Sequence, residues 1–278
     1  MCKKENDPPE ISVLLCVYRP AAAQLAEAVS SIIDQSFQSW EMILYDDGSG
    51  REYSRLLEDT AGMDLRIQLI RNPENRRLSG ALNEALKLAR GRYIARMDGD
   101  DLSQPERFRK QYDYLESHRE TDWVGCNTYL MDNDGIWGSR NVPERPQPKD
   151  FLPYSPYIHP AVMFRKEVLE QAGGYRLSRR GEDYELFMRL TAAGCEGCNI
   201  QETLYIYRED KDSYSRRSYT TMVEEMKIRR EGFRRLGILN LGTWIYVIKP
   251  LIVGLLPCGL QHKLKRRRGK NYVERHSG

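Results

Sequence analysis

Residues 93–102 read YIARMDGDDL, and this stretch places the whole chain in a fold class. Its first five residues are typical of a buried strand, whereas three carboxylates follow within four positions, at Asp98, Asp100 and Asp101. Carboxylates this close repel one another, and burying them without a partner is costly. A strand that ends in such a cluster therefore indicates a site that binds a positively charged group.

The same strand belongs to a repeating pattern of strands and helices. A short apolar run is typical of a strand covered on both faces, and apolar residues three and four apart are typical of a helix. The expected strands are 11–17, 40–45, 65–70 and 92–97, and the expected helices are 21–35, 51–60 and 78–89. This alternation predicts an α/β fold with a doubly wound, mostly parallel sheet.

The second half of the chain is less regular. The segment 133–149 is rich in Gly, Pro and charge, and we expect a loop there. The expected helices are 105–118, 166–172, 182–193 and 218–236, and the expected strands are 123–131, 161–164 and 203–208.

The composition is that of a folded protein, because 40% of the 278 residues are hydrophobic and 30% are charged. The net charge of +3 is unevenly placed: residues 261–278 hold seven Lys and Arg against one acid, so the rest of the chain is net negative. We therefore expect no nucleic-acid partner. The six cysteines form no disulfide framework and fit a reducing compartment, and the first ten residues lack the apolar core of a signal peptide.

Polar clusters follow the first four predicted strands, at 18–19, 46–47, 71–77 and 98–101. The carboxyl ends of parallel strands share one edge of a sheet, and ligands bind in the crevice there. We therefore expect these clusters to converge on one cleft that contains both arginines and acids.

Such a cleft suits a phosphate compound held with a divalent cation. Mg²⁺ and Mn²⁺ prefer oxygen ligands and often use one or two carboxylates together with substrate phosphates. Gly99 would let the backbone approach a ligand closely. The alternative is that these acids cap a helix that begins near Pro105, and that the Asp-Gly sequence at Asp47 is an ordinary turn. The usual ATP-binding and dinucleotide-binding glycine motifs are absent from the sequence.

Several stretches, in this order, resemble family 2 glycosyltransferases with the GT-A fold. They are ISVLLCVYRP, SIIDQSF, WEMILYDDGSG, NEALKLARGRYIARMDGDD and GEDYELFMRL. The resemblance implies a GT-A domain over 11–215, in which 11–104 binds the nucleotide and 105–215 the acceptor. Residues 216–278 would then form C-terminal helices and a basic tail, which resembles that of enzymes from bacterial exopolysaccharide operons.

The resemblance also implies roles for individual residues. The acid pair at 46–47 would read the uracil or another base, and Asp98 would lie nearer the ribose. Asp98 and Asp100 match the DxD motif of the family, with Asp100 as the direct ligand of Mn²⁺ or Mg²⁺. The residues that would bind the nucleotide are Cys16, Val17, Tyr18, Asp46, Asp47, Arg77, Asp98 and Gly99.

Asp183, beside Glu182, matches the catalytic base of the family. It would take the proton of the acceptor hydroxyl, and attack on the face opposite the leaving group would invert the anomeric carbon. The resemblance leaves Glu182 as a possible contact of the phosphate or the acceptor. The alternative is that both acids only stabilise the start of a helix. His159 falls in a segment that the family places near the pyrophosphate and the acceptor; the alternative is a polar residue in a turn before Pro160.

The chain departs from the family pattern at one place. The family often has a Tyr-Arg-x-His run late in the domain, where this chain has Tyr-Arg-Glu-Asp at 207–210. In the resemblance, Asp210 could still reach a metal, or Arg208 and Lys211 could hold phosphate.

The apolar stretch 243–260 is interrupted by Lys249, Pro250 and Pro257 and is too short for a spanning helix. Followed by the basic run, it predicts peripheral association with the inner face of the cell membrane. The alternative is a helix packed on the domain, with a solvated basic end.

These features together predict an inverting, metal-dependent hexosyltransferase. It would move a sugar from a nucleotide-sugar, most simply a UDP-sugar, to a saccharide or lipid-linked acceptor in exopolysaccharide or other cell-surface polysaccharide biosynthesis. Two alternatives remain open at this point. A nucleotidyltransferase would also use acids and metal but would release pyrophosphate, and an interaction protein with the GT-A fold would act through its tail.

Overall fold

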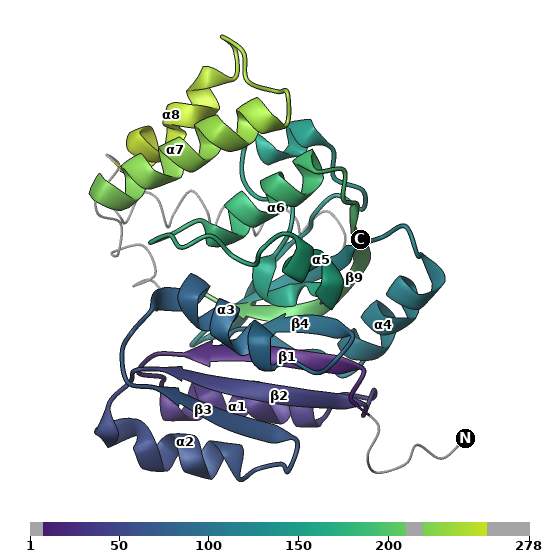
Figure 1. Ribbon diagram of the computed structural model, residues 1–278, viewed down its shortest axis with the longest axis vertical. Coiled ribbons are helices and arrows are strands. Elements are labelled where there is room, and N and C mark those ends of the chain that lie inside the picture. The colour runs from purple at the N-terminus through teal and green to yellow at the C-terminus, as the bar shows by residue number, and fades with distance from the viewer. Residues whose placement is uncertain (1–7, 210–218, 255–278) are drawn as a thin grey trace. The chain divides into compact units, whose positions relative to one another are not determined.

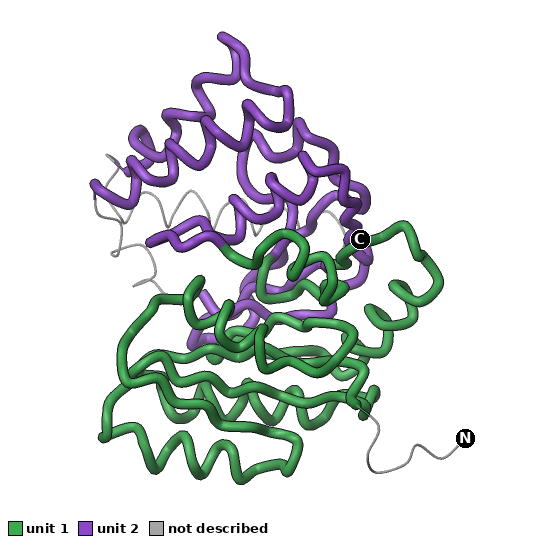
Figure 2. Tube along the Cα trace, in the orientation of Figure 1, with its two compact units in different colours: residues 1–124, 159–175 green, residues 125–158, 176–278 purple. Residues whose placement is uncertain are grey.

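A computed structural model describes residues 8–209 and 219–254 of the chain (Figure 1). The chain folds into two compact units that interleave in sequence (Figure 2). The first unit comprises residues 1–124 and 159–175, and the second comprises 125–158 and 176–278. The boundaries at 104 and 215 that the resemblance implies stay a prediction.

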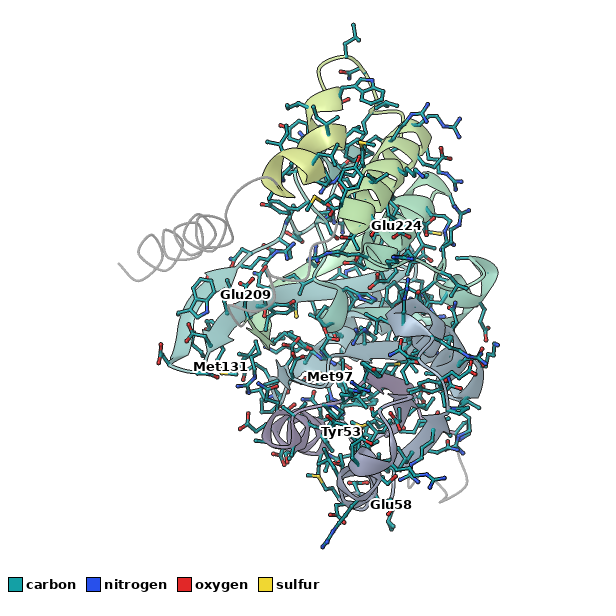
Figure 3. All side chains as sticks on the ribbon, turned by 90° about the vertical axis from the view of Figure 1, so that its left-hand side faces the viewer. Tyr53, Glu58, Met97, Met131, Glu209 and Glu224 are labelled. Carbon is teal, nitrogen blue, oxygen red and sulfur yellow. The ribbon has the colours of Figure 1, made fainter. Side chains whose placement is uncertain are left out.

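The first unit is built on a sheet with the strand order β3-β2-β1-β4-β8-β6. The strands β1, β2, β3 and β4 pair in parallel, whereas β8 is antiparallel to both β4 and β6. This confirms the α/β class and the mostly parallel sheet. The strands are β1 Ile11–Val17, β2 Trp40–Asp47, β3 Ile67–Asn72, β4 Tyr93–Met97, β6 Trp123–Asp132 and β8 Met163–Arg165, and Figure 3 labels Met97 at the end of β4.

Helices follow the parallel strands in the predicted alternation. Apolar residues spaced three and four apart are fully enclosed along α1, among them Leu25 and Ile32, and along α3, among them Leu82 and Ala85. Burial of these apolar faces against the sheet drives the packing of this layer. The remaining elements of the first unit are α1 Ala22–Ile33, η1 Arg51–Tyr53, α2 Ser54–Ala61, α3 Arg77–Leu88, β5 Leu102–Ser103, α4 Arg107–Ser117, η3 His159–Ala161 and α5 Lys166–Gln171.

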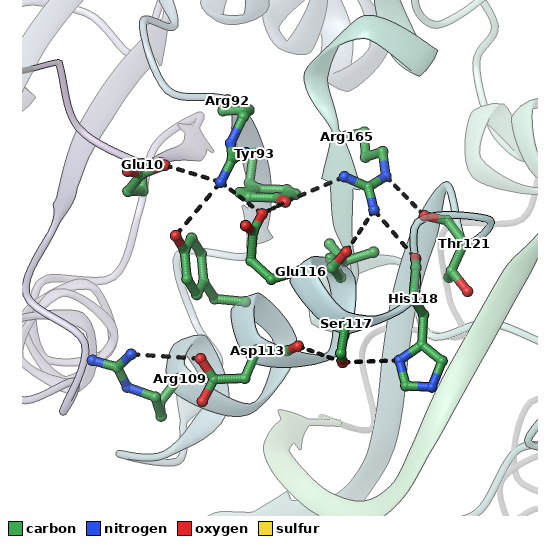
Figure 4. A network of polar contacts seen from close by, with 12 residues as sticks. Glu10, Arg92, Tyr93, Arg109, Asp113, Glu116, Ser117, His118, Thr121 and Arg165 are labelled. Atoms are coloured by element: carbon green, nitrogen blue, oxygen red, sulfur yellow. Dashed lines mark hydrogen bonds and ion pairs between the residues drawn. The ribbon is translucent and has the colours of Figure 1, made fainter.

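A polar network ties the amino end of β4 to α4 and β8 (Figure 4). Tyr93, the first residue of β4, donates its hydroxyl proton to Glu116 of α4. Arg92 also donates to Glu116, at 2.6 Å, and Arg165 of β8 donates to the Tyr93 hydroxyl at 3.2 Å. The bonds from Tyr93 and Arg92 lower the pKa of Glu116, against an opposing effect of burial. The network fixes this end of the sheet with charge-assisted bonds.

The second unit continues β6 and adds the strands β7 Gly135–Arg140 and β9 Gly197–Arg208. The strand β7 pairs antiparallel with β6, and the residue after β9, Glu209, donates its amide proton to the carbonyl of Met131 at 2.8 Å; Figure 3 labels both residues. The helices of this unit are η2 Pro148–Phe151, α6 Glu182–Ala192, α7 Tyr219–Arg235 and α8 Trp244–Gly254.

The predicted loop at 133–149 is wrong over β7, which forms a hairpin with β6. The turn between them closes when the amide of Asp134 donates to the side chain of Asp132 at 3.0 Å. Gly135 has a φ of 109°, a conformation that other residues rarely adopt. The same polar and glycine-rich composition that indicates a loop also supplies a hairpin turn, and composition alone does not distinguish the two.

The helix α8 lies beside α7 in the second unit (Figure 1). Val247 and Pro250 are buried on α8, and the buried Arg229 of α7 donates to the carbonyls of Leu152, at 3.1 Å, and Tyr246, at 3.5 Å. Within residues 8–209 and 219–254, none of the helices combines enough length and apolar character to cross a lipid bilayer. The basic tail of the sequence falls outside the described residues.

We predict that Glu116→Gln lowers the free energy of unfolding most at neutral pH. The folded protein holds the pKa of Glu116 below its ordinary value, so the ionised carboxylate stabilises the fold above the ordinary carboxyl pKa, and this stabilisation is lost as pH falls through the lowered pKa. Urea unfolding of both proteins at several pH values should show the difference shrinking in acid. Glu120→Gln, at an exposed position, is the control; a difference that does not depend on pH would contradict the assignment.

Candidate active site

The site forms where β1, β2 and β4 end. In the parallel register Val17 lies opposite Asp46, and Leu15 lies opposite Met97, so the segments after these strands begin at one edge of the sheet. Asp46 in turn pairs with Arg71 of β3. The polar clusters of the first unit are thus brought to the same edge, as the strand pattern predicts.

An acid cluster follows β4 directly. Carboxylate oxygens of Asp98, Asp100 and Asp101 all lie within 4.8 Å of one another. Their burial is graded: Asp101 is almost fully enclosed, Asp98 is partly exposed, and Asp100 is exposed. Carboxylate oxygens are the ligands that Mg²⁺ and Mn²⁺ prefer, and the donor set therefore fits such an ion.

Arg96, which sequence reasoning missed, compensates part of this negative charge. Its side chain is almost wholly buried inside β4, and its guanidinium donates to Asp98 at 2.6 Å and to the carbonyl of Met97. Arg107 of α4, also fully buried, donates to the carbonyl of Arg96 at 3.3 Å. The available signal was an arginine within a strand that is otherwise apolar, since a buried guanidinium needs a partner.

Gly99 allows the acid cluster to lie against the end of β1. A Cβ atom at this position would stand 2.8 Å from Cγ1 of Val17, closer than real side chains approach. The β-branched Val17 has little freedom to move its methyl groups away. The close approach therefore depends on glycine, and it brings the turn of β4 against a residue that the sequence predicts to line the nucleotide pocket.

The acids at the end of β2 organise the neighbouring loops. Asp46 accepts a bond from the amide of Ser49 at 2.9 Å, which closes the turn after β2, and Ser49 accepts one from the amide of Arg19 at 2.8 Å. Asp47 accepts the amide proton of Arg76 at 2.8 Å and so holds the segment before α3. Burial raises the pKa of Asp47, against the lowering effect of this bond. That these acids also read a base stays a prediction.

Two residues at this edge have a positive φ, a backbone conformation that is unusual for residues other than glycine. Arg77, at the start of α3, has a φ of 62°, and Arg19, just after β1, has a φ of 50°. Left-handed conformations cost bulky residues about 1 kcal/mol or more, and they gather at functional sites where the surroundings hold them in place. The amide of Arg77 donates to the side chain of Asn75 at 3.0 Å, a bond that supports this conformation.

The thiol of Cys16, the penultimate residue of β1, lies near charged groups from the ends of β2 and β4. Burial raises the pKa of its thiol to about 12, and the charges of Arg96, Asp47 and Asp98 also act on it. Charged groups from β2 and β4 thus surround one thiol of β1. The protonated thiol is therefore favoured at neutral pH. Its neighbour Tyr18 is exposed.

His159 is buried in η3 of the first unit. Its Nε2 atom lies 2.9 Å from the hydroxyl oxygen of Tyr175. Asn83 of α3 holds Tyr175 in turn, donating to its carbonyl and accepting from its amide, each at 2.8 Å. Burial, with the positive charge of Arg96, lowers the pKa of His159 well below its ordinary value, so the imidazole is neutral at pH 7. A role toward pyrophosphate stays a prediction.

The other predicted residues belong to the second unit. Glu182 and Asp183 are the first two residues of α6, after Gly181 with its φ of 81°. Arg208 ends β9, and Asp210 lies outside the described residues. The roles predicted for these four residues as base, phosphate ligand or metal ligand remain predictions.

The geometry of the first unit defines a class of protein: an α/β enzyme with a cluster of oxygen ligands beyond the ends of parallel strands. The family model for glycosyl transferase family 2 matches residues 12–182. The chain belongs to this family and is a glycosyltransferase.

Three known proteins illustrate the relationship. The chain is 38% identical to the putative glycosyltransferase EpsE of Bacillus subtilis (strain 168), over 97% of this chain and 98% of that one. It is 30% identical to the UDP-Gal:alpha-D-GlcNAc-diphosphoundecaprenol beta-1,3-galactosyltransferase of Escherichia coli, over 91% and 94%. Its fold is similar to that of the mannosyltransferase PcManGT from Pyrobaculum calidifontis in complex with GDP-Man and Mn²⁺, with a TM-score of 0.60 and 17% identity, over 96% of this chain and 84% of that one.

We predict that Gly99→Ala weakens nucleotide binding about tenfold or more, because the added methyl group forces the acid cluster away from β1. Val17→Ala removes the methyl group that the new Cβ would clash with. The double variant Gly99→Ala/Val17→Ala should therefore recover much of the lost nucleotide affinity. Titration calorimetry with UDP and Mn²⁺ measures the affinities, with Val17→Ala alone as the control. A double variant as weak as Gly99→Ala would show that the contact with Val17 is not the cause.

Proposed function

We propose that the chain is an inverting, metal-dependent glycosyltransferase that moves a sugar from a UDP-sugar onto a saccharide or lipid-linked acceptor, in the assembly of an exopolysaccharide or another cell-surface polysaccharide. The observation that carries this proposal is the acid cluster of Asp98, Asp100 and Asp101 at the edge where β1 and β2 also end. The printed names of the relatives support it, since one names a UDP-Gal donor and a diphosphoundecaprenol acceptor, and another a complex with GDP-Man and Mn²⁺.

The metal site of the proposal uses the exposed Asp100 as its direct ligand. Asp98 is already bonded to Arg96, so its carboxylate is fixed in direction and partly neutralised. A divalent cation bound there would stabilise the negative charge that builds up on the departing diphosphate. Both Mg²⁺ and Mn²⁺ suit a carboxylate site, and the proposal covers either.

The nucleotide of the proposal lies over the ends of β1 and β2. Cys16, Val17 and Tyr18 would line the pocket, and Tyr18 offers an exposed ring on which a base can stack. Asp47 would accept a bond from the base in addition to those it accepts from Arg76, Asn72 and Arg77. Arg77, held at the start of α3, would place its positive charge near the diphosphate.

In the reaction proposed, the acceptor oxygen attacks the anomeric carbon of the donor sugar. A new carbon–oxygen bond forms to the acceptor while the bond to the diphosphate oxygen breaks, and its electron pair leaves with the nucleoside diphosphate. Asp183 takes the proton of the acceptor hydroxyl. Attack from the face opposite the leaving group inverts the anomeric configuration. A neutral His159 can donate a hydrogen bond without adding charge.

We predict that Asp100→Ala abolishes Mn²⁺-dependent nucleotide binding but leaves the fold intact. A ligand that binds only the folded form raises the melting temperature by mass action, so UDP with Mn²⁺ should stabilise the natural protein more than UDP alone. Because Asp100 is exposed, the variant should melt at the natural temperature without ligand. The exposed Asp59→Ala is the control; an undiminished Mn²⁺-dependent shift in Asp100→Ala would refute the role of Asp100.

We predict that Asp183→Asn lowers the rate of transfer by roughly a hundredfold to ten-thousandfold, the usual contribution of a general base. Donor binding, measured by the same thermal shift, should persist because the amide keeps the shape of the carboxylate. Glu182→Gln, in the same first turn of α6, is the matched comparison and should lose less activity, because Glu182 is predicted to contact the phosphate or the acceptor and not to take the proton. Equal losses in both variants would mean that the turn as a whole is required, and Asp183 would lose its assignment.

A further inference from the structure

The helix α8 presents a continuous apolar surface to solvent, which we call the α8 stripe. Its members are exposed over 36% to 53% of their surface. Isolated exposed apolar residues are ordinary, whereas a contiguous apolar patch marks a contact with a partner or a membrane. The stripe consists of Trp244, Ile245, Ile248 and Ile252, and Leu241, three residues before the helix, is also exposed.

Helix geometry places these side chains on one face. Trp244, Ile248 and Ile252 are four residues apart, and with about 100° between successive residues all four members fall within about a third of the circumference. Val247 and Pro250, on the opposite face, are buried. The helix α8 packs beside α7 (Figure 1). The α8 stripe is thus what remains outside after the helix has packed on its own unit.

No charge interrupts the stripe. Lys249 is the one charged residue in α8; it is half-buried, and its ammonium group donates to the carbonyl of Pro153. Trp244 has the amphipathic ring that settles at the boundary between lipid headgroups and acyl chains. The surface therefore has the chemistry of a helix that lies in the plane of a membrane.

The sequence around the stripe indicates which partner it fits. Residues 236–273 contain no Asp or Glu, and residues 261–278 carry seven Lys and Arg against one acid. An apolar surface joined to a run of positive charge matches an anionic lipid surface, in which acyl chains take the apolar side chains and headgroups take the charges. A second copy of this chain would bring the same positive charge to the contact and would be repelled.

We propose that the α8 stripe inserts into the interfacial layer of an anionic lipid bilayer, and that the positive charge in the sequence of 261–278 favours this lipid. This inference rests on the proposed function only in that a lipid-linked acceptor would make such placement useful. It adds to that function a defined surface, and it assigns the apolar and the electrostatic contributions to different parts of the chain.

The test is co-sedimentation of the full chain with vesicles of phosphatidylcholine, with and without about 30% phosphatidylglycerol. Binding should require phosphatidylglycerol and weaken as salt rises from about 0.1 M to about 0.5 M, because the Debye length falls. Ile245→Glu/Ile252→Glu should lower the partition coefficient about tenfold or more, since two charges enter the stripe. Arg266→Gln/Arg267→Gln/Arg268→Gln should lower binding to anionic vesicles and reduce its salt dependence.

The matched control is Leu65→Glu/Leu177→Glu, which makes the same change at two positions that are more exposed but lie off α8. Thermal melts verify that each variant folds. The control should bind vesicles as the natural protein does. Equal binding by the stripe variant and the control would overturn the inference, as would equal binding to vesicles with and without phosphatidylglycerol.

Two further measurements separate this inference from the proposed function. Asp100→Ala should bind vesicles normally, and Ile245→Glu/Ile252→Glu should keep its thermal shift with UDP and Mn²⁺. Vesicle binding in a protein that shows no nucleotide shift would refute the proposed function and leave the stripe supported. The natural protein could instead fail to bind vesicles and form dimers in sedimentation velocity. If Ile245→Glu/Ile252→Glu dissociated these dimers, the stripe would be a contact with a second copy, and the lipid proposal would be overturned.

Discussion

Repulsion among the three carboxylates after β4 is the constraint on which the architecture of the first unit depends. Such a cluster persists only where the fold supplies opposing charge, and Arg96 supplies it from within the strand. A buried guanidinium is itself costly, so the neighbouring carbonyl of Met97 accepts from it as well. Gly99 then lets the turn lie against β1. One short segment, from Arg96 to Asp101, thus contains the acids, the arginine that opposes their charge and the glycine that lets the turn pack against β1.

The acids of the site divide into two groups by what they contact. Asp46 and Asp47 bind backbone amides and give the loops after β2 and β3 their conformation. Asp100 lies at the exposed end of the other group, where an incoming ligand can meet it. In such a site the loops are held in place by the protein's own hydrogen bonds, while the residues that meet a substrate stay accessible. This arrangement favours a binding site whose geometry is fixed before the substrate binds.

Local sequence patterns predicted the parallel strands, the helices between them and the edge where the polar clusters meet, because period and burial are encoded within a few residues. They did not predict the β7 hairpin, whose turn has the composition of a loop. Nor did they predict the contacts of Asn83 with Tyr175, 92 positions apart, or the pairing of Arg96 of β4 with Asp98, just after the strand. Contacts between distant segments leave no local periodicity, and an arginine within an apolar strand indicates that a partner is needed but not which residue supplies it. The roles assigned to Asp183 and His159 came from family resemblance and remain to be tested.

The antiparallel strand β8 has a consequence for how the chain folds as it is made. It pairs with β4 on one side and β6 on the other, yet Met163 follows Met97 only after a long intervening stretch. Until that stretch has left the ribosome, β4 has an unpaired edge, able to join a strand of another nascent chain. Closure through such a distant segment is slow compared with local pairing. Fragments that stop near Val124 would keep this edge open permanently, and aggregation would then compete with folding.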